Sequence, residues 1–265
     1  VIGGRFCALK TFGNTIEEML IKEPAALKAA LGENPKRCYN QKKASPMTRM
    51  ATAALLREAF YKARAYGEKK NAAGAGGEAP ELDMGMECLL EVLRGELPLK
   101  IHCHRADDIQ TAIRIAEEFG ISYTLDHCTE GYMMTDVLKA HNARCILGPI
   151  LIGRPKIEMK NLSYSGAAVL ERAGIEFALS TDHPETPVQL LNVSAAYLVR
   201  NGLSEEAALR AMTVNAARIT GLDGRIGAVK EGLDADIVVF DGHPLDVRAK
   251  VLMTVINGRV VYGGL

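Results

Sequence analysis

The sequence has no excess of charge of either sign and no long apolar run, and both absences exclude classes of protein. Lys plus Arg and Asp plus Glu each number 32, so the totals give no basic face for nucleic acid. Apolar runs fall short of the roughly 18 to 20 residues that span a bilayer. The first residues also lack a basic-then-apolar signal pattern. We therefore expect neither a nucleic-acid nor a membrane partner.

Dense cysteine patterns and glycine-rich phosphate loops are missing as well. The six cysteines lie far apart, unlike the framework of a small secreted domain, which favours a reducing, cytoplasmic compartment. A nucleotide site of the doubly wound type would need a glycine-rich loop after a strand, and the sequence has none. The chain begins at Val1 rather than Met, which we interpret as a sign of truncation.

Alternating strands and helices are the main pattern that is present. With 265 residues and 48% hydrophobic content, the chain can bury one large core or two modest ones. The segments between the strand-like runs carry apolar residues at helical spacing. This alternation predicts a parallel sheet covered by helices, either a barrel or, as the alternative, an open doubly wound sheet. The predicted strands are 99–103, 121–125, 144–147 and 175–180, and the helices between them are 109–119, 136–141 and 166–173.

The flanking segments have a different character. Upstream, 46–68 reads as one long helix with Ser45 as N-cap and Pro46 at its first position, followed by a Gly/Ala-rich loop at 71–80. Residues 16–21 and 25–31 read as short helices with room for one strand. Helices are expected at 188–200 and 205–212. The runs 236–240 and 251–262 are β-rich, with Asn257-Gly258 as a hairpin turn. We expect an α/β body over 1–220 and a small β unit over 221–265.

Polar residues that suit a metal site follow the predicted strands. One βα unit separates His102 from His127, and about two units separate His127 from Asp182. Two neutral imidazoles and a carboxylate are good ligands for Zn²⁺, and a carboxylate beside a metal-activated water can act as general base. His104 lies two residues after His102, so on a strand it would share the same face and could contact substrate or metal.

Four ordered motifs connect these residues to a known family. The stretches 101–109 (IHCHRADDI), 125–131 (LDHCTEG), 179–184 (LSTDHP) and 232–244 (GLDADIVVFDGHP) resemble the metal-dependent amidohydrolase superfamily, closest to its imidazolonepropionase-like and prolidase-like branch. This resemblance implies a (β/α)₈ barrel of the TIM type, incomplete at its amino end, with a small β-sandwich portion at the carboxy terminus. It also implies hydrolysis of an amide or cyclic-amide C–N bond in a small molecule.

The resemblance implies roles for individual residues. The family's fifth-strand and sixth-strand metal histidines fall on His102 and His127. Its eighth-strand aspartate falls on Asp182, which would take the proton of the attacking water and pass it to the leaving nitrogen. Our candidate for the fourth-strand ligand is Glu33. Zinc is the first choice of metal, and iron, manganese or nickel also suit these ligand types. The family's first-strand His-x-His has no counterpart before His102.

Several alternatives stay open at this point. His183 could polarise a substrate or simply order the loop at Pro184. Cys103 and Cys128 flank the histidines, but strand alternation makes them small buried hydrophobes rather than zinc ligands. The cations that follow strand ends could hold a substrate carboxylate, although exposed loop positions are the more ordinary role; these are Arg105, Arg154 and Lys156.

Three functional hypotheses follow from these observations. The first is the metal-dependent hydrolase described above. The second is a truncated, catalytically silent chain that acts as a structural or binding module, with its exposed sheet edges covered in a homo-oligomer. The third is a mononuclear enzyme in which Asp182 or Glu33 joins the two histidines, because three ligands and a water suffice for catalytic zinc.

Overall fold

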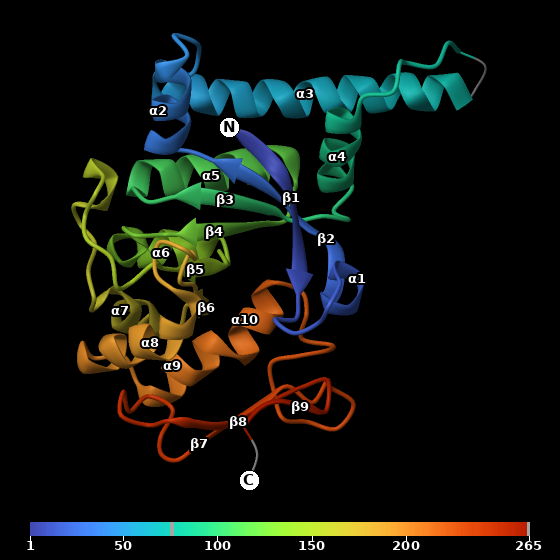
Figure 1. Ribbon diagram of the computed structural model, residues 1–265. Coiled ribbons are helices and arrows are strands. Elements are labelled where there is room, and N and C mark those ends of the chain that lie inside the picture. Colours follow the sequence, from blue (N-terminus) through green and yellow to red (C-terminus); the bar gives the residue numbers. More distant parts are fainter. Residues whose placement is uncertain (75–76, 264–265) are drawn as a thin grey trace.

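A mostly parallel six-stranded sheet forms the centre of the molecule (Figure 1). The structure, a computed structural model, describes residues 1–74 and 77–263. The sheet order is β1-β2-β3-β4-β5-β6, in which β1 pairs with β2 antiparallel and all later neighbours are parallel. The strands are β1 (Ile2–Leu9), β2 (Leu20–Ala30), β3 (Leu99–Cys103), β4 (Tyr123–His127), β5 (Cys145–Leu147) and β6 (Phe177–Leu179).

Helices connect and cover these strands. Between β2 and β3 lie α2 (Glu33–Gln41), α3 (Arg49–Gly74) and α4 (Met84–Leu93), while α1 (Ile16–Met19) precedes β2. The parallel strands are then joined by α5 (Ala106–Phe119), α6 (Thr135–Ala140) and α7 (Gly166–Arg172). After β6 come α8 (Leu191–Arg200), α9 (Glu205–Met212) and α10 (Val214–Ile219). The predicted βα alternation is therefore confirmed, with strand ends shifted by a few residues.

The helix α5 shows how the sequence dictates these units. Its first turn carries Asp107 and Asp108, which suit the positive end of the helix dipole, and Gly120 ends it in the left-handed conformation. The face with Ile109 and Ile113 is buried against the sheet. Because helix and strand bury each other's apolar surfaces, the polar residues gather at the carboxyl edge of the strands.

The bounds predicted for the long amino-terminal helix were wrong. The long helix begins at Arg49 rather than at residue 46, because Thr48 and not Ser45 accepts the hydrogen bond from the backbone N–H of Ala51 (3.1 Å). It also continues to Gly74, into the expected 71–80 loop, whose residues 75 and 76 lie outside the described part. In the segment expected to hold short helices and room for one strand, α1 is the helix and β2 is the strand, in which pairing with β1 and β3 outweighs the Ala and Leu content.

The carboxy-terminal β unit is a separate antiparallel sheet of β7 (Ile237–Phe240), β8 (Val251–Ile256) and β9 (Arg259–Gly263). The turn at Asn257 and Gly258 is confirmed, with both residues at positive φ (52° and 75°). Figure 1 shows this sheet at the opposite end of the molecule from α3, beyond α8 to α10. None of the described helices is long and apolar enough to cross a membrane.

Lys10 ties the amino-terminal strands to the tail that precedes β7. Its side chain is only 6% exposed, and its ammonium group is paired with the carboxylates of Asp234 (3.1 Å) and Asp236. Arg225 adds a hydrogen bond to the backbone carbonyl of Ile21 (3.3 Å) and an ion pair with Asp234 (2.8 Å). These charged contacts therefore join the two ends of the described chain.

Candidate metal centre

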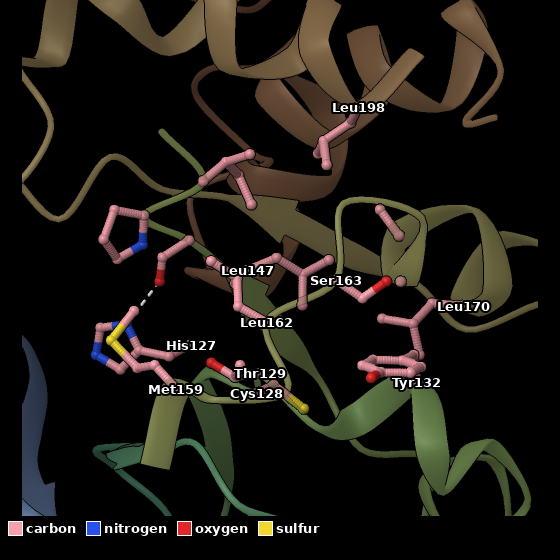
Figure 2. A pocket seen from close by; sticks show the side chains of 15 residues that line it. His127, Cys128, Thr129, Tyr132, Leu147, Met159, Leu162, Ser163, Leu170 and Leu198 are labelled. Atoms are coloured by element: carbon pink, nitrogen blue, oxygen red, sulfur yellow. Dashed lines mark hydrogen bonds between the residues drawn. The ribbon is translucent and has the colours of Figure 1, made fainter. Parts of the chain in front are cut away.

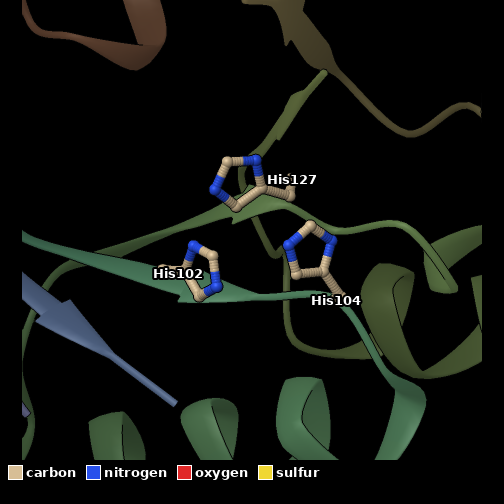
Figure 3. A group of neighbouring side chains, drawn as sticks. All are labelled: His102, His104 and His127. Atoms are coloured by element: carbon tan, nitrogen blue, oxygen red, sulfur yellow. The ribbon is translucent and has the colours of Figure 1, made fainter. Parts of the chain in front are cut away.

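Three histidines meet at the carboxyl edge of β3 and β4 (Figure 3). His102 lies within β3, His104 follows that strand, and His127 is the last residue of β4. One ring nitrogen of each lies within 4.8 Å of the others, and the ring centroids are 4.5 to 4.8 Å apart. The structure thus brings together His102 and His127, as the strand-end pattern predicted, and adds His104 to the group.

The backbone at the end of β4 changes the direction in which the His127 side chain points. In the parallel register His127 pairs with Cys103, whose side chain alternates away from that of His102. His127 has a left-handed φ of 72°, and Cys128 follows with 44°. A residue other than glycine in this region costs about 1–3 kcal/mol, and such strain gathers at functional sites. The strained turn is what directs the third imidazole toward the other two.

Hydrogen bonds at Nδ1 fix the orientation of two of the rings. Nδ1 of His127 lies 2.6 Å from the carbonyl oxygen of Gly148, so it donates a proton and leaves Nε2 with its lone pair. Nδ1 of His104 lies 2.7 Å from the hydroxyl of Thr129. Both arrangements are those in which a neighbouring oxygen orients a metal-binding histidine.

Glu158 is a residue of this site that the sequence did not reveal. It lies on a short 3-10 turn, Ile157–Met159, in the connection after β5, and its side chain is 0% exposed. Its Oε1 is 3.7 Å from Nε2 of His102 and also 3.7 Å from Nε2 of His104. In the sequence it is an isolated acid in a basic loop, so neither spacing nor motif marks it.

Three of these buried polar atoms face one another without partners. Among the described residues, Nε2 of His102, Nε2 of His104 and Oε1 of Glu158 have no hydrogen-bond partner. Each such atom costs about 1–3 kcal/mol when it is left unsatisfied in a protein interior. Imidazole nitrogens and a carboxylate oxygen are the donor types that bind Zn²⁺ and similar ions. The donor set therefore fits a divalent metal.

Burial keeps the imidazoles neutral. The pKa of His102 is lowered to about 2, first by burial and then by electrostatic interactions with His127 and Lys156. The pKa of His104 is lowered by burial and by the two neighbouring histidines. That of His127 is lowered by burial, although the hydrogen bond to Gly148 opposes this. Neutral imidazoles keep the lone pairs that a metal needs.

A cleft of about 350 Å³ opens onto the three histidines. Asp182 lines it from the end of β6, where its φ of 50° is again left-handed. Three cationic residues, Lys28, Arg37 and Lys156, line the same cleft together with a second carboxylate, that of Glu185. His183 follows Asp182 and is exposed. The structure therefore places the predicted base and the predicted histidine ligands around one space.

Behind His127 lies a smaller pocket with mostly apolar walls (Figure 2). Figure 2 shows His127 and Met159 at one end, Tyr132 and Leu170 at the other, and the hydrogen bond to Gly148 as a dashed line. This apolar backing is part of the burial that lowers the pKa of His127.

Other predicted residues are spread around the centre. Glu33 begins α2, and its Oε1 accepts a hydrogen bond from the backbone N–H of Glu158 (3.2 Å). Within residues 1–74 and 77–263, the group whose ligand atoms all lie within 4.8 Å of one another comprises the three histidines and includes neither Glu33 nor Glu158. Cys103 and Cys128 are buried. Burial raises the thiol pKa of Cys103, and the contact with Cys145 followed by burial raises that of Cys128. This agrees with their prediction as small hydrophobes.

The cations that we considered for a substrate carboxylate separate into two groups. Arg105 pairs with Asp107 (2.9 Å), and Arg154 donates to the backbone carbonyl of Leu162 (2.8 Å). Lys156 instead lines the cleft, 3.9 Å from Oε1 of Glu158. The structure therefore favours Lys156 among the three.

A group of ion pairs formed by Asp126, Lys100 and Lys28 lies next to the histidines. Asp126 is buried beside His127 and pairs with Lys100 (2.9 Å) and Lys28 (3.3 Å). Burial raises the pKa of Asp126, but the two ammonium groups outweigh it and hold the pKa below its ordinary value. The carboxylate also accepts a hydrogen bond from Thr124 (3.1 Å). No motif or spacing in the sequence indicates these ion pairs.

Comparison with known proteins agrees with this geometry. The family model described as "Amidohydrolase family" matches residues 87–262, a span that includes the three histidines, Glu158 and Asp182. The chain belongs to the amidohydrolase family. Its structure is similar to that of an amidohydrolase from Thermotoga maritima MSB8, with a TM-score of 0.96 and 43% identity over 99% of this chain and 69% of that one.

Two curated relatives are more distant in sequence. The amidohydrolase tasK of Hapsidospora irregularis is 29% identical over 257 residues, which are 89% of this chain and 25% of that protein. An imidazolonepropionase of Maricaulis maris (strain MCS10) is 29% identical over 171 residues, 63% of this chain and 41% of that protein. The chain thus spans between a quarter and about two fifths of these relatives.

Proposed function

We propose that this chain hydrolyses a C–N bond, an amide or a cyclic amide, in a small molecule with the help of a divalent metal ion. The observation that carries the proposal is the set of buried, unpartnered donor atoms of His102, His104 and Glu158 in the described chain, with His127 beside them. Membership of the amidohydrolase family and similarity to an imidazolonepropionase support this reaction class. The particular substrate is a matter for screening.

The residues divide into an ion-holding group and a proton-transferring group. His102 and His127 would hold the ion, with zinc as first choice and iron, manganese or nickel as alternatives, and His104 can contact the ion or the substrate. A bound ion would polarise the substrate carbonyl and make a water molecule more acidic. Asp182 accepts the proton of the attacking water and returns it to the leaving nitrogen. His183 is our candidate for a hydrogen bond to substrate.

Two carboxylates in addition to Glu158 remain candidates for the ion itself. Asp182 shares the cleft with the histidines, and the sequence pattern assigned it both to the metal and to proton transfer. Glu33 lies beside Glu158 through the backbone hydrogen bond described above. Substitution of each carboxylate by its amide separates the roles, because a ligand changes metal affinity while a pure base changes only turnover.

The architecture suggests how the chain relates to a complete fold. Across residues 1–74 and 77–263 the sheet runs from β1 to β6 without closing. We propose that it is part of a (β/α)₈ barrel over 1–220, with 221–265 as part of a β-sandwich; the likeness to the Thermotoga maritima amidohydrolase supports this. Exposed edges at β1 and β6 favour a homo-oligomer that covers them. A cytoplasmic location remains our proposal from cysteine usage.

Metal analysis of the purified protein tests the proposed function. We expect about one equivalent of metal per chain, lost in His102→Ala and in His127→Ala. His141→Ala is the matched control, because His141 is exposed on the far end of α6 and contacts Glu117. Asp182→Asn should lower kcat on any substrate found by about 10²–10⁴-fold, and its metal content tells whether Asp182 also binds the ion. A wild-type protein without metal would refute the proposal and favour the silent structural or binding module.

A further inference from the structure

Glu158 is a buried carboxylate whose two oxygens have different surroundings. Oε2 accepts a hydrogen bond from the backbone N–H of Glu33 (2.7 Å) and lies 3.6 Å from a guanidinium nitrogen of Arg49. Oε1 has no hydrogen-bond partner within the described residues and faces the imidazoles of His102 and His104. A buried charge is normally paired or coordinates a metal. The asymmetry therefore points to a cation on the histidine side.

The distances around Oε1 suit an ion and do not suit a direct hydrogen bond. A separation of 3.7 Å from each imidazole nitrogen exceeds the usual hydrogen-bond range. Four ligands at about 2.0–2.1 Å from tetrahedral zinc are about 3.3–3.4 Å apart. The two distances from Oε1 exceed this separation by a few tenths of an ångström, and the histidine nitrogens, which lie within 4.8 Å of one another, would draw closer around the ion. Lys156 lies 3.9 Å from the same oxygen, beyond hydrogen-bond distance.

The surroundings of Glu158 hold its carboxylate in this position. Gly32 has a φ of 75°, and a Cβ there would lie 2.4 Å from Oε2 of Glu158. The same Cβ would lie 3.2 Å from Oδ2 of Asp108, which accepts a hydrogen bond from Arg49 (2.9 Å). Glycine, backbone N–H and guanidinium thus enclose one side of the carboxylate. The open side is the one that faces the histidines.

We infer that Glu158 is a metal ligand, so that a single divalent ion is held by His102, His104, His127 and Glu158. This inference rests on the proposed function. It differs from the residue set expected from the sequence, because it replaces Glu33 with Glu158 as the carboxylate ligand and adds His104. Asp182 then stays outside the ligand group, where it can transfer protons. The site would consist entirely of residues between 102 and 158.

Zinc titration of metal-free protein against a chelating dye tests this inference. Glu158→Gln keeps the size and the hydrogen bond to Glu33 but removes the charged ligand, so zinc affinity should fall by at least about 10-fold. Glu33→Gln tests the competing ligand: its amide oxygen can still accept the bond from Glu158, so on this inference affinity should stay within about threefold. Cobalt bound to Glu158→Gln should also show an altered visible spectrum, whereas Glu33→Gln should match wild type.

Unfolding of the metal-free proteins separates a ligand from a structural ion pair. Without an ion, only Oε2 of the buried Glu158 carboxylate accepts a hydrogen bond, and Glu158→Gln keeps that bond while it removes the buried charge, so the variant should be at least as stable as metal-free wild type. Zinc should then raise its unfolding midpoint less than it raises that of wild type. If Glu158 served only to pair with Arg49, the metal-free variant would be the less stable one, and such a result contradicts the inference.

The remaining outcomes distinguish the two proposals. Wild-type zinc affinity in Glu158→Gln would overturn the inference while leaving the proposed function intact. Loss of affinity in Glu33→Gln alone would give the ligand role to Glu33. A wild-type protein that takes up neither zinc nor cobalt would overturn both proposals. Glu158→Asp, which moves the carboxylate back by one methylene, should recover part of the affinity that the amide loses.

Discussion

Replacing Gly148 with alanine should disrupt the turn that orients His127. Gly148 has a φ of 129°, and a Cβ built on it would lie 1.8 Å from the carbonyl oxygen of Ser180 and 2.9 Å from its carbonyl carbon. Both contacts are backbone atoms of the neighbouring strand end, so a side-chain movement cannot relieve them. The backbone must shift, and the carbonyl that holds Nδ1 of His127 shifts with it.

The size of the effect follows from two costs. Overpacking costs about 1–3 kcal/mol, and a non-glycine residue in a forbidden backbone region costs about 1–3 kcal/mol more. Their middle values sum to about 4 kcal/mol of unfolding free energy, or roughly a thousandfold in the folding equilibrium. That is a large part of the about 5–15 kcal/mol that holds a typical protein folded.

Urea denaturation of metal-free protein measures this change. Gly153→Ala is the matched control, because Gly153 lies in the same connection and its added Cβ would meet nothing within 4 Å. The control should differ from wild type by at most about 0.5 kcal/mol. Gly148→Ala should also bind zinc more weakly, since the His127 ring loses its orienting carbonyl. If the two variants unfolded within about 1 kcal/mol of each other, the argument from Gly148 would be refuted.

Three further outcomes are expected. Lys10→Met should lower the unfolding free energy by about 1–2 kcal/mol, a buried-pair effect reduced by the partial exposure of both carboxylates. Burial raises the pKa of Asp234, but Lys10 and Arg225 outweigh it and hold this pKa below its ordinary value of 3.8. The ion pair therefore stabilises the fold above pH 3.8. The difference in unfolding free energy between wild type and Lys10→Met should become smaller as the pH falls below that value. A difference that did not change with pH would contradict this role of the ion pair. Arg37→Ala should raise KM about 10-fold for substrates with a carboxylate and leave kcat unchanged. The KM of the amidated analogues of these substrates should not change. An equal rise in KM for the substrates and for their analogues would exclude Arg37 from carboxylate binding. Chelator should abolish hydrolysis and lower the unfolding midpoint, and zinc at about 100 times its Kd should restore about 2.7 kcal/mol; an unchanged midpoint would argue against a bound ion.

Much of the carboxyl-terminal two-thirds was predictable because its signals are local. Apolar runs buried on both faces give the parallel strands, and helical spacing gives α5 to α9 between and after them. His102 and His127 could be predicted as partners, because parallel strands end at one edge of their sheet. The amino-terminal strand β2 could not, since its Ala-rich and Leu-rich sequence favours a helix until β1 and β3 pair with it.

Glu158 marks the limit of reading a site from strand ends. It lies on an irregular connection, and it reaches the histidines because Gly32 leaves room for it and Glu33 donates a backbone N–H to it. Those contacts join residues that are far apart in the chain, and no periodicity encodes them. A loop residue becomes part of a site only through such tertiary contacts. The sequence therefore suggested Glu33, a neighbour of Glu158 in space, and held no signal for Glu158.

The strained backbone at His127 connects the fold to the proposed chemistry. Ideal alternation along β4 would send this side chain to the same face as Cys103, away from His102. The left-handed residues at 127 and 128 reverse that direction at a cost of about 1–3 kcal/mol each. The cost is tolerated because the bond to Gly148 and the apolar pocket behind the ring fix the imidazole in one orientation. An ion that binds only this arrangement would offset the strain, which links metal binding to the order of the whole sheet edge.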